Sequence, residues 1–98
     1  NMDITGLEKE ILALDNIKLQ KLLSWLTHED IAVMVLLFSK ETGAQILNNT
    51  SKGGYKIVVE EREKLQDCYE DKLPETLPKI RKYIDLIIAG KGIEYLDD

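Results

Sequence analysis

The sequence predicts an all-α fold, because apolar residues recur at helical spacing along most of its 98 positions. The period-two alternation of a half-buried strand is absent, and so are the Asn-Gly and Asp-Gly dipeptides of tight hairpins. Six segments carry the helical pattern, with links of a few residues between them. We therefore expect a compact stack of about six short helices, similar to armadillo-like modules, in a single domain over residues 1–98.

The first two helices are expected over about residues 5–14 and 16–26. In the first, the apolar stripe at i, i+4 and i+7 consists of Leu7, Ile11 and Leu14. Asp15 lies between the helices and is the predicted N-cap of the second, because its carboxylate can accept from free amides of the first turn. The second helix has one leucine face, formed by Leu19, Leu22, Leu23 and Leu26.

Thr27 is the predicted cap of a third helix that reaches about Phe38, and Glu29 and Asp30 follow it where the helix dipole favours negative charge. This helix is nearly apolar all round, so we expect it to be the most enclosed element of the fold. Ser39 then caps a fourth helix. Residues 48–50, Asn-Asn-Thr, end that helix with side chains that compete for backbone hydrogen bonds.

A fifth helix is expected over about residues 51–65, although Gly53 and Gly54 each weaken its first turn by about 1 kcal/mol relative to alanine. The run Ile-Val-Val at 57–59 resembles a strand. Lys56, Glu60 and Lys64, however, recur at i, i+4 and i+8, which is typical of a solvated helical face. The helical interpretation therefore takes precedence.

The last helix ends near Ile88, because Gly90 lies where a left-handed C-cap residue is expected. Its start has two alternatives. Pro74 can occupy the first turn, which leaves Pro78 in the interior without a backbone donor, or Thr76 can be the N-cap with Pro78 in the first turn. The sequence does not decide between them.

No constellation of catalytic or metal-binding residues is visible. His28, the only histidine, lacks the orienting partner and nucleophile of a general base, so we expect a surface residue at a helix start. Cys68 is a lone thiol, for which we expect a half-buried, small apolar role. The acidic residues of 60–71 alternate with lysine and arginine, which indicates a charged surface rather than a cation site. We therefore predict a non-enzymatic protein without cofactor or metal.

Two aromatic residues are singled out. Trp25 lies among leucines and is expected to pack in the core, whereas Tyr55 follows two glycines at a helix start and is expected to be partly exposed to a partner.

Composition narrows the class of partner. The formal net charge of −5 opposes binding to nucleic acid or to anionic lipid, and the helix over 31–38 that could imitate a recognition helix offers no donors to base edges.

The longest apolar run has eight residues, far fewer than the roughly 20 of a membrane span. No secretory signal is visible, and a single cysteine fits a reducing cytoplasm. Basic or neutral protein partners are favoured, and Asn1 suggests a piece of a longer chain.

Four short segments carry a resemblance to a known family: DNIKLQKLL at 15–23, EDIAV at 29–33, ILNNTSK at 46–52 and VEE at 59–61. Their order and gap-free spacing resemble the C-terminal domain of the flagellar motor switch protein FliG. The resemblance implies a right-handed stack of short helices that docks proteins of the motor's cytoplasmic ring at the basal body, in motility and chemotaxis. The implied partners are the cytoplasmic loop of the stator protein MotA, the switch protein FliM and neighbouring FliG domains.

The resemblance carries over unevenly to individual residues. Glu60 and Glu61 match the acidic pair on the family's torque-bearing helix. Leu36 stands where the family has a lysine, and Gly53 stands where it has an arginine. The predicted partner-binding site is a charged ridge that consists of Lys52, Lys56, Glu60, Glu61 and Lys64.

These departures leave two alternatives open beside a motor protein. One is a FliG paralogue without a motor role. The other is a helical regulatory domain similar to the N-terminal portion of MgtE-type magnesium channels, which senses Mg²⁺ through acidic surfaces.

Overall fold

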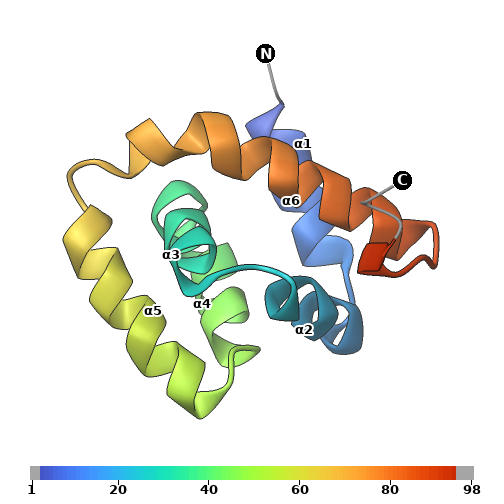
Figure 1. Ribbon diagram of the computed structural model, residues 1–98, viewed down its shortest axis with the longest axis horizontal. Helices are drawn as coiled ribbons and strands as arrows, with labels where there is room; N and C mark the ends of the chain where they lie inside the picture. The colour runs from blue at the N-terminus through green and yellow to red at the C-terminus, as the bar shows by residue number, and fades with distance from the viewer. Residues whose placement is uncertain (1–2, 95–98) are drawn as a thin grey trace.

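The computed structural model describes residues 3–94, which form six α-helices and one short 3-10 helix, with no strand in this range (Figure 1). The all-α prediction is confirmed. The elements, in chain order, are α1 (Ile4–Ala13), α2 (Asn16–Ser24), α3 (His28–Leu37), α4 (Lys40–Asn48), α5 (Lys52–Leu65), η1 (Tyr69–Lys72) and α6 (Leu73–Ile88).

Side-chain N-caps begin each of the first five helices. The predicted caps Asp15, Thr27 and Ser39 are confirmed, since each accepts from a backbone amide three residues further on. At Thr27 the cap is reciprocal, because the Asp30 carboxylate accepts from the Thr27 amide in turn. Ser51 caps α5 in the same manner. The locations of the helices therefore follow largely from local sequence.

Helix α3 lies in the centre of the hydrophobic core, as its apolar sequence predicts. Residues 30–34 of this helix are all buried, and α3 contacts α4, α5, η1 and α6. Figure 1 shows α3 and α4 in the interior of the drawing, with α5 along one edge and α6 across another. The large side chains with almost no exposed surface include Leu7, Leu19, Leu22, Met34, Ile46, Val58, Ile80 and Ile84.

The start of α6 follows the first of the two alternatives. Pro74 lies in the first turn and Pro78 lies inside the helix. At the other end, Gly90 has φ of 72°, and the amides of Lys91 and Gly90 donate to the carbonyls of Leu86 and Ile87. This is a Schellman motif, so the predicted glycine C-cap is confirmed.

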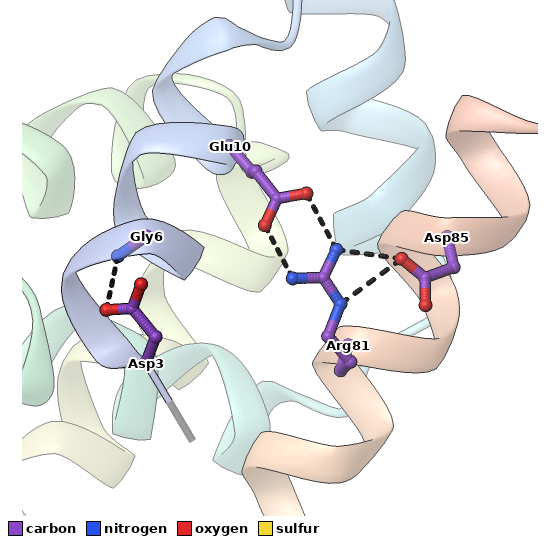
Figure 2. Close-up of polar contacts among 5 residues, drawn as sticks. All are labelled: Asp3, Gly6, Glu10, Arg81 and Asp85. Atoms are coloured by element: carbon purple, nitrogen blue, oxygen red, sulfur yellow. Dashed lines mark hydrogen bonds and ion pairs between the residues drawn. The ribbon is translucent and has the colours of Figure 1, made fainter. Parts of the chain in front are cut away.

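Ion pairs connect distant helices. Figure 2 shows the Arg81 guanidinium of α6 between the carboxylates of Glu10 in α1 and Asp85 in α6. The Arg81 Nη2 atom lies 2.7 Å from Glu10 and 2.8 Å from Asp85. Hydrogen bonding to Glu10, and then to Asp85, raises the pKa of Arg81 further above its ordinary value. In the same way the buried Asp30 receives a 2.8 Å hydrogen bond from Lys79, which raises the pKa of Lys79 and connects α3 to α6.

Two predictions about single residues have opposite outcomes. Trp25 packs against the core and meets the ring of Tyr83 edge-on, with the ring centroids 5.7 Å apart, so its predicted packing role is confirmed. The prediction of a half-buried Cys68 is wrong, because its thiol is exposed. Leu65 is the last α5 residue in the core, and the turn that follows it carries Cys68 along the surface.

None of the helices within residues 3–94 is long and apolar enough to cross a membrane.

Candidate functional site

The charged ridge predicted from the sequence lies entirely on α5. Lys52, Lys56, Glu60 and Lys64 are exposed, and Glu61 is half-buried. Four of the five residues are spaced by four positions, so successive ridge residues follow one another along the same side of the helix. The structure therefore brings together all five predicted residues, as neighbours on one element.

The opposite side of α5 is held against the core. Gly54, Val58 and Leu65 are its buried residues, and α3 is the helix that α5 contacts most extensively. Lys52, Lys56, Glu60 and Lys64 lie on the other side of the helix and point away from α3. Glu61 is three residues after Val58 and four before Leu65, so it adjoins the buried side. The four exposed side chains of the ridge therefore face the surroundings of the molecule.

The charges of the ridge are mostly unpaired within residues 3–94. The Lys64 Nζ atom lies 3.7 Å from Glu61 Oε1, which is the one ion pair that α5 forms among the described residues. Lys56 and Glu60 are four residues apart but form no ion pair, and a lysine that precedes a glutamate is the less favourable order for such a pair on a helix. Lys52 also has no ion-pair partner among residues 3–94.

The order of charges along α5 does not follow the helix dipole. Lys52 is the first residue of the helix, where the dipole favours an anion, and no acidic residue occurs in the first turn. Glu60, Glu61 and Glu63 come in the second half, although Arg62 and Lys64 there do suit the dipole. The basic start of α5 therefore has no explanation in the stability of the isolated helix.

Exposed apolar side chains accompany the charges. Tyr55 is 47% exposed and Ile57 is 42% exposed, so the predicted exposure of Tyr55 is confirmed. Gly53 is also at the surface, and a Cβ placed on it would meet no atom within 4 Å. A partner could therefore approach the backbone of α5 closely at this position.

A groove of about 590 Å³ adjoins the N-terminal end of α5. Its lining comes from α2, from the start of α3 and from the α4–α5 link. The core residues Leu23, Leu26 and Ile31 contribute to it, together with amides, hydroxyls and the imidazole of His28. His28 is exposed, as expected, and its Nε2 atom would lie 3.2 Å from a Cβ placed on Gly54. Sequence reasoning missed this groove, because the segments that form it are separate along the chain.

The two positions where the motor-switch family has basic residues differ in their surroundings. Leu36 is half-buried and packs against the hydrophobic core. Gly53 faces open space at the ridge itself. A basic side chain is therefore structurally compatible with position 53, whereas Leu36 has a packing role.

No protein-family model matches this chain, and no curated protein and no solved structure matches it significantly. The relationship to the motor-switch family stays a prediction that depends on the four segments of the sequence. Within residues 3–94, no group of three or more His, Cys, Asp or Glu side chains is arranged to hold a metal ion. The charged ridge and the groove beside it are thus the features from which a function can be argued.

Proposed function

We propose that this chain is a non-catalytic protein-interaction domain that docks partner proteins through the charged ridge of α5. One observation carries the proposal: Lys52, Lys56 and Glu60 are exposed on the outward side of α5 without an ion-pair partner among the described residues. Unpaired exposed charges of both signs provide electrostatic complementarity, which steers association and selects among partners. Tyr55 and Ile57 add apolar area that a bound partner would cover.

The proposed partners are proteins of the flagellar motor, namely a MotA-like stator loop and a FliM-like switch protein, with the cytoplasmic face of the basal body as the location. The support is the sequence resemblance, in which Glu60 and Glu61 occupy the positions of the family's acidic pair. Leu36 and Gly53 lack the family's basic side chains, so we propose a divergent member, or a paralogue, whose ridge depends on Lys52 and Lys56 for positive charge.

An NMR titration tests the proposal. The labelled domain is titrated separately with a stator-loop peptide and with a FliM fragment, and the amide shifts are mapped on the chain. We expect the shifts to cluster between Lys52 and Lys64 and the affinity to fall at least severalfold in Glu60→Lys. The matched control is Asp71→Lys, which makes the same charge change at an exposed residue outside α5.

Shifts that avoid α5, or equal affinities for Glu60→Lys and Asp71→Lys, would show that the ridge is not the docking surface. If neither motor protein shifts any amide, the flagellar part of the proposal fails.

A further inference from the structure

The charges on the outward face of α5 are complementary to themselves when the helix is reversed. This face consists of the residues on the side away from α3: Lys52, Gly53, Lys56, Ile57, Glu60, Glu63 and Lys64. Gly53, Lys56, Glu60 and Glu63 are spaced by three and four positions, and so are Gly53, Ile57, Glu60 and Lys64. This spacing aligns both series along one broad stripe of the helix. Lysine dominates the first half and glutamate the second.

We propose that α5 pairs with α5 of a second copy of this chain, in antiparallel orientation about a two-fold axis near position 58. This inference rests on the proposed function, in which α5 is the docking surface. It adds the identity of one partner for that surface, a second copy of the chain. Two-fold symmetry makes such a contact isologous, so each favourable pair occurs twice. A parallel arrangement would instead place Lys56 against Lys56 and Glu60 against Glu60.

The register follows from the two unpaired charges nearest the middle of the face. A two-fold axis at position 58 places Lys56 level with Glu60 of the second copy along the helix axis. By symmetry, Glu60 is level with Lys56 of the second copy. Neither side chain forms an ion pair within residues 3–94, so no existing interaction has to break. The free-energy cost of removing Lys56 and Glu60 from water is offset by the two new Lys56–Glu60 ion pairs between the copies.

The same register brings favourable neighbours to both flanks of the face. On one flank, Lys52 lies within one residue's rise of Glu63 of the second copy, which gives a second pair of opposite charges. On the other flank, Ile57 approaches Ile57 of the second copy, and the two residues are offset by about 3 Å along the helix axis. Lys64 comes level with Lys52 of the second copy, and its own partner Glu61, together with Glu63, offsets that like-charge approach.

The face is unobstructed in the structure. Figure 1 shows α5 along one edge of the molecule, with α3 and α4 on its inner side. Ile57 is 42% exposed, and the open space at Gly53 lets two helix backbones approach. Because α5 has 14 residues and so is about 21 Å long, the contact is small, and we expect a weak, salt-sensitive dimer with Kd on the order of 100 µM.

A charge exchange between two variants tests the pairing by sedimentation equilibrium at low salt. Lys56→Glu makes both central positions acidic, and Glu60→Lys makes both basic. Each variant alone places like charges opposite each other, so we expect self-association to weaken about tenfold or more. Mixed in equal amounts, the two restore every opposite-charge pair at the centre and form a heterodimer tighter than either homodimer. The double variant Lys56→Glu with Glu60→Lys keeps complementarity and regains the homodimer.

The matched control is a mixture of Lys82→Glu and Asp71→Lys, which have the same net charges as the two test variants but alter exposed residues outside α5. Because α5 is unchanged in both, we expect each control variant, alone or mixed, to self-associate as the wild-type chain does. Circular dichroism of every variant verifies that the helices are intact.

The proposal is overturned if the α5 variants, with native helix content, sediment as monomers when mixed, or if Lys82→Glu and Asp71→Lys weaken self-association as much as the α5 variants do. This outcome is separable from the motor-protein titration. Shifts on α5 with a stator or switch fragment, and no heterodimer, would refute self-pairing and leave the proposed function in place. A heterodimer with no response to either fragment would support self-pairing and refute the motor partners.

Discussion

The adjacent glycines Gly53 and Gly54 give the sharpest test of the packing of α5. Both lie in its first turn, and each is less favourable in a helix than alanine by up to about 1 kcal/mol. Their surroundings differ. A Cβ on Gly53 meets nothing within 4 Å, whereas a Cβ on Gly54 would lie 2.9 Å from Ser51 Oγ and 3.2 Å from both His28 Nε2 and Thr50 Cγ2.

The same substitution is therefore expected to change stability in opposite directions. Gly53→Ala gains helix propensity without a clash, so we expect it to raise the free energy of unfolding by about 0.5–1 kcal/mol. Gly54→Ala displaces the Ser51 hydroxyl that accepts from the Gly54 amide, and loss of an N-cap costs about 1 kcal/mol. Together with the strain against His28 and Thr50, the net loss is about 0.5–2 kcal/mol.

Urea unfolding followed by circular dichroism measures both variants against the wild type. In thermal unfolding of a domain of this size, about 1 kcal/mol corresponds to roughly 4–8 °C in Tm. Each variant serves as the control for the other, because the substitution and the helical turn are the same. A stabilising Gly54→Ala, or two effects of equal sign and size, would refute the close packing of α5 against the α3 start.

Three further predictions concern the core, acid stability and magnesium. Met34→Ala removes a fully buried α3 side chain and should cost about 2–5 kcal/mol in urea unfolding, whereas Ile17→Ala, at a position 79% exposed, should cost under about 0.5 kcal/mol. Hydrogen bonds from Thr42, and then from Ser39, lower the pKa of Glu8 below 4.5, so their stabilising effect is present above pH 4.5 and is lost as pH falls through the folded pKa. The stability difference between wild type and Thr42→Val should therefore shrink on acidification, and a difference independent of pH between 3 and 7 would contradict this. Millimolar Mg²⁺ should leave Tm unchanged relative to an equal ionic strength of NaCl, and a specific rise would favour the magnesium-channel alternative.

The sequence predicts the helices well because their signals are local. Asp15, Thr27 and Ser39 each act on amides within the next turn, and the apolar stripes need only the spacing of 3.6 residues per turn. The start of α6 is different. Pro78 costs the helix an interior hydrogen bond, yet α6 continues through it because Thr76, Leu77 and Ile80 are buried on both sides of the proline.

The candidate site was predictable in part for the same reason. Ridge residues on one helix follow from their spacing, so the sequence alone suffices to place Lys52 and Glu60 on one face. The ion pair between Arg81 and Glu10 and the groove beside His28 join segments that are distant in sequence. Their formation depends on how helices pack, and neither spacing nor composition reports that.

The edge-on contact of Trp25 with Tyr83 has a practical consequence for spectroscopy. Trp25 is the only tryptophan, and it lies at the end of α2 against a ring from α6. Its fluorescence therefore reports the separation of α2 from α6 and is insensitive to events confined to α5. Unfolding curves from tryptophan emission and from circular dichroism should coincide if the six helices melt together. If α5 opens alone, ellipticity will fall before the emission spectrum shifts, so one protein sample reveals whether the docking helix moves independently of the core.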